Sequence, residues 1–250
     1  MNLRVRGLNK SFDERLVLSD INLEIQDHEF VCILGPSGCG KSTLLNIIAG
    51  LDSPTSGTIF TGDKPVTGPS NDRVMMFQSQ SLFPWLTVIE NIKFGLQFKK
   101  LTKQEQDEIA QKYLRLVKLE EFAGYHVYQL SGGMQQRVSM ARALAIESDF
   151  ILMDEPFSSL DKQTINILRE ELESLWRLLK NTIIYVTHSV EEAVFFADRI
   201  VMLSANPGKI KRIFDVDLPR PRKVDEDEVI HLRAMILKEL RYEVERSEKQ

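Results

Sequence analysis

The 250-residue sequence predicts an α/β fold built on a mostly parallel sheet. Short apolar runs of strand length open the chain, and helical spacing of apolar residues takes over from about Val88. Two later apolar runs, Phe150–Met153 and Thr182–Val186, are each followed by another helical pattern. Strands that alternate with helices are typical of parallel sheets, because a helix is the usual crossover between parallel strands.

The first sixty residues are predicted to form strands separated by turn residues such as Asp27-His28. The expected strands are Leu3–Leu8, Ile21–Ile25, Phe30–Leu34 and Thr58–Thr61. The stretch from about residue 82 to 145 is then expected to be a helical insertion between two strands. Within it, Thr102 and Glu105 have the spacing of a capping box at the start of a helix.

The last thirty residues are dense in charge and predict an amphipathic helix. Apolar residues follow the acidic cluster Asp225–Glu228 at helical spacing, namely Val229, Leu232, Ile236 and Leu240. We therefore expect one domain over residues 1–220 and a C-terminal helix over 221–250. Docking of this helix on the domain is favoured, and a partner-binding role is the alternative.

The composition excludes several classes of protein. A net charge of -4 argues against a protein that binds nucleic acid through its phosphate backbone, which needs a basic excess. No apolar stretch reaches the ~18 residues expected of a membrane span, and the N-terminus lacks the pattern of a secretory signal. Cys32 and Cys39 lie away from any His/Cys cluster, so we expect free thiols in a reducing compartment.

A phosphate-binding loop is predicted between the apolar strand ending at Leu34 and the helix that follows. The segment has the form G-x-x-x-x-G-K-S in a strand-to-helix context, which separates such a loop from a chance match. Its glycines let backbone N–H groups converge on a phosphate, and the helix dipole adds positive potential there. Lys41 can reach the β- and γ-phosphates, and the Ser42 hydroxyl can ligate Mg²⁺. The loop residues are Gly35, Pro36, Ser37, Gly38, Cys39, Gly40, Lys41, Ser42 and Thr43.

Two acids end the apolar run at residue 150. Asp154 suits a carboxylate that holds Mg²⁺ through its hydration shell. Glu155 suits a general base that orients a water in line with the γ-phosphate. Alone, this pair would indicate only an acidic turn, but beside a phosphate loop it predicts nucleotide hydrolysis.

A second anion site is predicted where Ser131-Gly132-Gly133 opens a helix. Glycines at a helix start leave N–H groups accessible, and Ser131 adds a hydroxyl at the N-cap. Two phosphate-facing helix starts in one chain suggest that each serves a different nucleotide, shared with a second copy of the chain.

Together, in the order in which they occur along the chain, these motifs resemble those of ATP-binding-cassette (ABC) ATPases over residues 3 to 220. The resemblance implies a P-loop NTPase core with a mostly parallel sheet, an N-terminal antiparallel β-subdomain and an inserted helical subdomain. It also implies roles for Gln78 toward Mg²⁺ and the attacking water, for His188 as a switch histidine, and for Phe12 on adenine. Gln135 belongs to the signature segment, and Ser159 and Asp161 match the loop that crosses the dimer interface.

Further segments resemble the nitrate/sulfonate/taurine importer ATPases. These are residues 77–88, Ser131–Arg137, Ser204–Ile210 and Leu218–Arg222. Met134 stands where Gln is usual, and Phe is less common than Tyr at position 12. The apolar cluster from Phe83 to Leu86 could receive a partner, and the resemblance favours a permease loop. The alternative is that Trp85 fills the junction of the helical insertion.

We therefore expect an ATP- and Mg²⁺-dependent ATPase that dimerises around two ATP molecules and drives a separate membrane permease. The resemblance implies a peripheral protein on the cytoplasmic face of the cell membrane that is linked indirectly to an extracytoplasmic substrate-binding protein. One alternative is a soluble ABC ATPase of the DNA-repair or translation type. Another is a small-molecule kinase, which would leave the segment from Leu130 to Arg137 unexplained.

Overall fold

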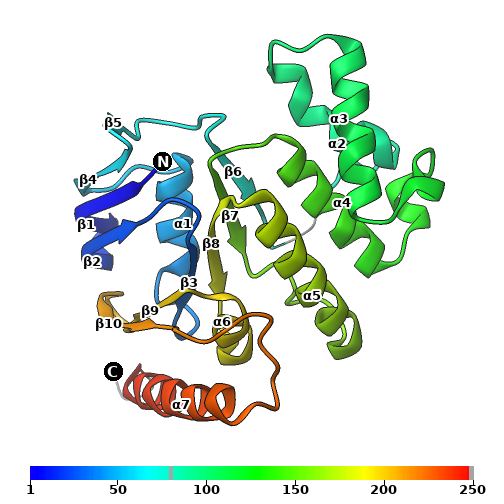
Figure 1. Cartoon of the computed structure of the whole chain (residues 1–250). Coiled ribbons are helices and arrows are strands. Elements are labelled where there is room, and N and C mark those ends of the chain that lie inside the picture. Colours follow the sequence, from blue (N-terminus) through cyan, green and yellow to red (C-terminus); the bar gives the residue numbers. More distant parts are fainter. Residues whose placement is uncertain (79–80, 248–250) are drawn as a thin grey trace. The chain divides into compact units, whose positions relative to one another are not determined.

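The computed structural model describes residues 1–78 and 81–247. The chain forms two compact units, Met1–Ser70 with Thr182–Gln250, and Asn71–Asn181. Each unit is α/β (Figure 1). Among the described residues, no helix combines the length and apolar character needed to cross a membrane.

The first unit begins with an antiparallel sheet in the strand order β2-β1-β4-β5. Buried Leu3, Val5 and Leu8 alternate with more exposed residues, so one face of β1 packs on the core. Both strands of the first hairpin run further than predicted, because the ladder continues to the pair Phe12↔Arg15 next to the turn. The strands are β1 (Leu3–Phe12), β2 (Arg15–Ile25), β4 (Ser56–Thr61) and β5 (Lys64–Pro65).

The same unit holds the parallel strands on which the nucleotide loop is predicted. β3 (Phe30–Leu34) pairs in parallel with both β8 (Thr182–Thr187) and β9 (Arg199–Leu203), and β10 (Ile210–Asp215) closes the edge antiparallel to β9. Every residue of β3 and β8 is buried, as expected for strands covered on both faces. The helices are α1 (Lys41–Ala49), α6 (Val190–Phe196) and α7 (Asp227–Ser247).

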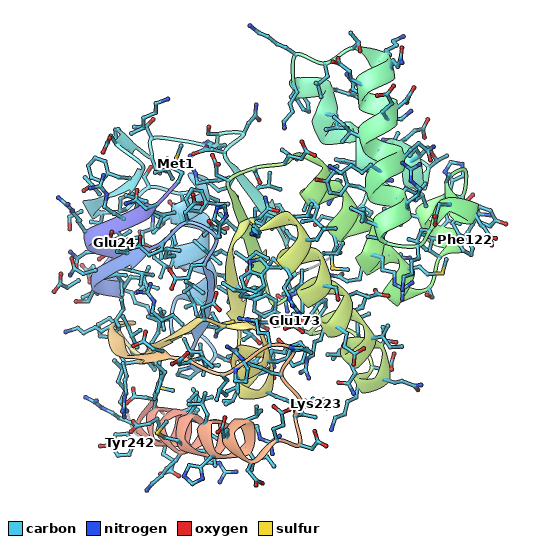
Figure 2. The ribbon with its side chains drawn as sticks, viewed as in Figure 1. Met1, Glu24, Phe122, Glu173, Lys223 and Tyr242 are labelled. Atoms are coloured by element: carbon cyan, nitrogen blue, oxygen red, sulfur yellow. The ribbon has the colours of Figure 1, made fainter. Side chains whose placement is uncertain are left out.

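Helix α7 buries the apolar residues predicted for it. Val229, Ile236 and Leu240 are buried, and Leu232 is half-buried. The helix packs against α6 and is also joined to β10, where Lys211 pairs with Glu239 and Glu243. Tyr242 lies near the C-terminal end of the helix (Figure 2). The Lys211 ammonium lies 4.7 Å from the centroid of the Tyr242 ring. Residues 248–250 of the predicted C-terminal segment lie outside the described residues.

The second unit combines parallel strands with helices (Figure 1). β6 (Arg73–Met76) pairs in parallel with β7 (Phe150–Asp154). Helices α2 and α3 pack against α4, and the predicted capping box of Thr102 and Glu105 is present. The predicted helical insertion falls within this unit, and its bounds stay a prediction. The helices are α2 (Val88–Phe94), α3 (Lys103–Leu116), α4 (Gly132–Ala145) and α5 (Lys162–Leu179), with short 3₁₀ turns η1 (Gly95–Phe98), η2 (Glu120–Phe122) and η3 (Val127–Gln129).

Candidate functional site

The predicted phosphate loop joins β3 to α1 in the first unit. Gly38 has φ 76° and Gly40, the N-cap of α1, has φ 95°, both in the left-handed region that favours glycine. A Cβ on Gly40 would also lie 2.7 Å from the Leu18 side chain, so the position has no room for one. The glycines therefore set a loop that turns sharply into the start of the helix.

The Lys41 side chain is hydrogen-bonded to the backbone of this loop. Its Nζ donates to the carbonyl oxygens of Gly35 and Pro36, each at 3.0 Å, and only 5% of the residue is exposed. Ser42, the next residue, is exposed at the first turn of α1. The ammonium is thus fixed next to the loop, where a phosphate could exchange for the carbonyl contacts.

His188 follows β8 at the same edge of the sheet as the phosphate loop. Leu34 and Thr187 are paired in the β3–β8 ladder, so Gly35 and His188 are the next residues of adjacent parallel strands. The imidazole-bearing residue is exposed, whereas the strand before it is fully buried. Ligands bind at this carboxyl edge in open α/β sheets, so the placement suits a residue that faces a nucleotide.

Ser189 and Glu192 have the spacing of a capping box, but only half of that box forms. The Ser189 hydroxyl accepts from the Glu192 N–H at 3.3 Å, as expected of an N-cap. The second bond of a capping box, from the Ser189 N–H to the Glu192 carboxylate, is not formed. The carboxylate accepts instead from the hydroxyls of Tyr185 and Thr187, at 2.9 and 2.7 Å. Burial of that carboxylate explains the difference, because the two hydroxyls are its partners inside the fold.

Phe12 ends β1 and borders a hollow of about 610 Å³ that Gly38 and Thr43 also line. The ring is 48% exposed, and the Lys10 ammonium lies 4.6 Å from its centroid. An exposed aromatic ring beside a phosphate loop could stack on a base. The sequence had not indicated Lys10 as a neighbour of this ring.

In the second unit, Asp154 is the last residue of β7 and Glu155 follows it. Met76 pairs with Met153 in the parallel ladder, so Gln78 and Asp154 leave neighbouring strands at one edge. Glu155 has φ 43°, an uncommon conformation for a residue with a Cβ. The backbone therefore turns sharply at the second acid.

Ser158 links the predicted glutamine to this turn. The Gln78 side-chain amide donates to the Ser158 hydroxyl at 3.3 Å, and that hydroxyl donates to the Glu155 carbonyl oxygen at 3.0 Å. Ser158 directly precedes Ser159 of the predicted interface loop, and only the fold reveals its two partners.

The predicted signature segment opens α4. The Ser131 hydroxyl caps the helix by accepting from the Met134 N–H at 3.3 Å. A Cβ on Gly133 would lie 2.9 Å from Thr164, and one on Gly132 would lie 3.3 Å from Leu160. Both glycines therefore border a hollow of about 430 Å³ that also includes Ser159 and Asp161.

Asp161 and Gln135 have local structural partners. Asp161 caps α5, and the hydrogen bonds from the Thr164 hydroxyl and N–H lower the pKa of its carboxyl. The Gln135 amide donates to the carbonyl oxygens of Val127 and Leu130, at 3.0 and 3.2 Å. It thus braces the turn before the signature segment, and its predicted contact with a nucleotide stays a prediction.

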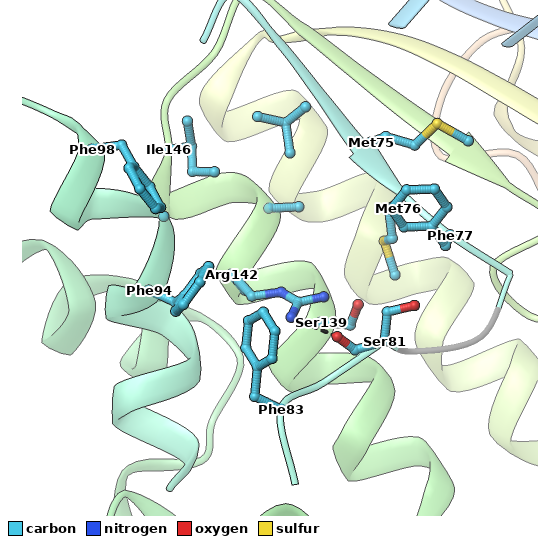
Figure 3. A pocket seen from close by; sticks show the side chains of 13 residues that line it. Met75, Met76, Phe77, Ser81, Phe83, Phe94, Phe98, Ser139, Arg142 and Ile146 are labelled. Atoms are coloured by element: carbon cyan, nitrogen blue, oxygen red, sulfur yellow. Dashed lines mark hydrogen bonds between the residues drawn. The ribbon is translucent and has the colours of Figure 1, made fainter. Parts of the chain in front are cut away.

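An apolar groove of about 390 Å³ lies near Phe83 in the same unit (Figure 3). The aromatic rings of Phe83, Phe94 and Phe98 line it, and the Arg142 guanidinium lies 5.5 Å from the Phe83 centroid. Burial lowers the pKa of Arg142, which also donates to the Ser81 carbonyl oxygen at 2.8 Å. Trp85 is 70% exposed, which disfavours the alternative that it fills an interior junction. Ser79 and Gln80 lie outside the described residues.

A family model described as ABC transporter matches residues 18–158, more than half of the chain. The chain belongs to the ABC transporter ATP-binding family. This confirms the predicted resemblance and the predicted fold class.

Individual relatives agree with this assignment. The cassette is 49% identical to an uncharacterized ABC transporter ATP-binding protein of Methanocaldococcus jannaschii, over 99% of this chain and 94% of that one. It is 47% identical to the nitrate import ATP-binding protein of a Synechocystis strain, over 88% and 84% of the two chains. A solved ATP-binding cassette, described as a dimer in a post-hydrolysis state with ADP and Pi, is 34% identical with a TM-score of 0.74 and covers 87% of this chain and 100% of its own.

ABC cassettes bind and hydrolyse ATP, so the cassette is an ATPase, as the motifs predicted. The phosphate loop, the two acids and the signature segment could be found from sequence because each has a fixed spacing. The contacts of Glu192, Ser158 and Lys10 could not, because they depend on side-chain orientation and, for Ser158, on a partner eighty residues away.

Proposed function

We propose that this cassette is the ATP-hydrolysing subunit of an importer and that it works as a dimer around two ATP–Mg²⁺. The hollow at the start of α4 carries the proposal. It is an anion-binding helix start, bordered by two glycines and by the Asp161 loop, in addition to the phosphate loop. In the proposed dimer, the nucleotide bound to the phosphate loop of the second copy is the ligand of this hollow.

In the proposed dimer, each ATP lies between the phosphate loop of one copy and the Ser131–Gly133 helix start of the other. Only the triphosphate is long enough to contact both surfaces, so its γ-phosphate closes the dimer. Hydrolysis removes that link and the dimer opens. ATP binding and hydrolysis are thereby converted into an opening and closing motion.

Three side chains act on the attacking water and the transferred phosphoryl, and two more bind the nucleotide. Glu155 accepts a proton from the attacking water and orients it in line with the γ-phosphate. His188 and Gln78 contact the transferred phosphoryl and its water, and Lys41 neutralises charge on the phosphates. Phe12 stacks on the adenine.

A divalent cation fits the donors that this chain offers. The Ser42 hydroxyl, the Gln78 amide oxygen and the Asp154 carboxylate are oxygen donors of the kind Mg²⁺ prefers, and they would hold it. When bound, Mg²⁺ supplies positive charge against the phosphate oxygens.

The apolar groove near Phe83 is the proposed seat for a short segment of a separate permease. Three aromatic rings and the exposed Trp85 offer apolar area, and the buried part of Arg142 provides a polar anchor. Bound there, the cassette lies on the cytoplasmic face of the membrane and is coupled through the permease to an extracytoplasmic substrate-binding protein. The relatives and segments favour nitrate, sulfonate, taurine or a similar small solute as cargo.

Two variants test the separate roles proposed for Glu155 and Lys41. Glu155→Gln should keep ATP affinity and lose most phosphate release, because a neutral amide cannot accept the water's proton. Lys41→Ala should lower ATP affinity itself. Near-normal turnover by Glu155→Gln, or unchanged affinity in Lys41→Ala, would remove these residues from their roles.

Co-purification tests the transport role. Trp85→Ala should lose a permease partner from detergent-solubilised membranes while keeping basal ATPase activity. Leu178→Ala, which changes an equally exposed apolar residue on α5, is the matched control. Isolation of the cassette with soluble DNA-repair or translation factors and no membrane protein would contradict the proposal.

A further inference from the structure

The turn that follows β9 packs closely against the phosphate loop. Its residue Gly208 is buried and forms two backbone hydrogen bonds with β2, donating to Val17 at 2.8 Å and accepting from Ser19 at 2.9 Å. Both backbone polar groups of Gly208, its N–H and its carbonyl, are therefore bonded to β2. The turn therefore has a defined position on the strand that also supports the loop.

Gly208 leaves no space between this turn and Cys39. A Cβ on Gly208 would overlap the Cys39 carbonyl oxygen and would lie 3.1 Å from the Leu18 side chain. The overlap is with backbone, so rotation of a flexible side chain cannot relieve it. Glycine is thus required by close approach, although φ at this position is not in the left-handed region.

The phosphate loop makes a second close approach to the same segment of the chain. A Cβ on Gly35 would lie 3.0 Å from the Leu203 carbonyl oxygen and 2.7 Å from the Cys39 thiol, which is almost fully buried. The start of the loop and its middle therefore both rest on the segment that runs from the end of β9 to Gly208.

The Cys39 carbonyl shares a peptide plane with the Gly40 N–H. Because the peptide group is rigid and planar, a displacement of that oxygen rotates or shifts the N–H with it. Gly40 is the N-cap of α1, where backbone N–H groups of the loop converge. A change in Gly208 would therefore reach the phosphate-binding surface through one peptide group.

We infer that Gly208 is a positioning residue for phosphate binding and that the turn Ser204–Lys209 is the support that sets the loop's N–H groups. Gly208 itself touches no nucleotide in this account. The inference rests on the proposed phosphate site at Gly35–Thr43 and adds a determinant of its geometry that lies about 170 residues further along the chain.

The test measures nucleotide affinity and apo stability side by side. Gly208→Ala should raise the Kd for both ATP and ADP about tenfold or more, because both nucleotides carry the phosphates that the loop binds. Gly68→Ala is the matched control, since a Cβ there meets nothing within 4 Å. Lys209→Ala, an exposed change in the same turn, is a second control. Both controls should bind nucleotide like the parent chain.

A purely structural role would lower the apo melting temperature of Gly208→Ala and leave the Kd of the folded fraction unchanged, which overturns the inference. Should Gly208→Ala fail to fold, Ser204→Ala takes its place. This change removes the hydroxyl that donates to Pro207 and accepts from Lys209, each at 3.2 Å, and should raise Kd about threefold. An unchanged Kd in Ser204→Ala would overturn the inference as well.

Lys41→Ala separates this inference from the proposed site. Weak binding by Lys41→Ala with normal binding by Gly208→Ala rejects only the positioning role. Normal binding by Lys41→Ala rejects the phosphate site itself and with it any role of Gly208 in positioning that site.

Discussion

The Gln78 amide and the Ser158 hydroxyl are hydrogen-bonded at 3.3 Å, although eighty residues separate them in the chain. The same hydroxyl donates to the Glu155 carbonyl oxygen at 3.0 Å. The glutamine that follows β6 is thus tied to the turn that carries the proposed base after β7. A displacement of Gln78 can be transmitted to Glu155 through the Ser158 side chain.

Loss of this link should slow hydrolysis more than it weakens ATP binding. Ser158→Ala removes the shared hydroxyl, which contributes about 1 kcal/mol as a typical hydrogen bond, so kcat should fall about three- to tenfold. Steady-state phosphate release measures kcat and KM separately. Ser174→Ala, an exposed serine on α5, should leave both unchanged. A rise in KM with constant kcat would contradict the proposed link.

The buried Glu192 should support turnover through the segment that carries His188. Glu192→Ala removes the carboxylate that accepts from the hydroxyls of Tyr185 and Thr187, so kcat should fall about tenfold with little change in ATP affinity. Glu192→Gln keeps an oxygen that can accept both bonds and should retain most activity. In a His188→Ala background, Glu192→Ala should add little. Full additivity of the two losses would show that Glu192 does not act through His188.

Phe12 should contribute to ATP affinity as a stacking surface. Phe12→Ala should weaken ATP binding about three- to tenfold, whereas Phe12→Tyr should preserve it. Leu16→Ala is the control, because Leu16 is an exposed apolar residue of the same hairpin. Equilibrium titration with ATP measures the effect, and equal affinities for Phe12→Ala and the parent chain would reject the stacking role.

Docking of α7 should depend on the charge of Lys211. Burial opposes that charge, but hydrogen bonds from the ammonium to Glu243 and Glu239 outweigh it and raise the Lys211 pKa above its ordinary value of 10.5. A pKa raised by folding adds stability below the unfolded pKa, and this stability is lost as the pH rises through the folded pKa.

Glu243→Gln should therefore destabilise the fold by about 1–2 kcal/mol at pH 8 and by less at about pH 11. Urea unfolding at the two pH values measures the difference. Glu245→Gln, an exposed change on the same helix, should have no effect at either. A destabilisation that grows with pH would contradict this account of α7.

Most of the fold follows from the sequence because its strands are buried on both faces or alternate regularly. β3 and β7 read as continuous apolar runs, and the Thr102 capping box has a fixed spacing. A spacing that predicts a local helix cap was misleading where the side chain has other partners on the preceding strand, β8. The Glu192 carboxylate meets a capping-box spacing, but two buried hydroxyls bind it instead.

The candidate site divides in the same way. Gly35–Thr43 and Ser131–Gly133 could be predicted because backbone geometry requires glycine at fixed intervals. The role of Gly208 could not, since the need for glycine there comes from the Cys39 carbonyl and not from any neighbour in sequence.

The central claim is that two copies close around ATP, and the mass of Glu155→Gln in solution tests it most directly. Light scattering after size exclusion should give about twice the 28.7 kDa chain mass with ATP and the single mass with ADP. Addition of Ser131→Arg to Glu155→Gln should restore the single mass. A monomer of Glu155→Gln at saturating ATP, with nucleotide binding intact, would contradict the account.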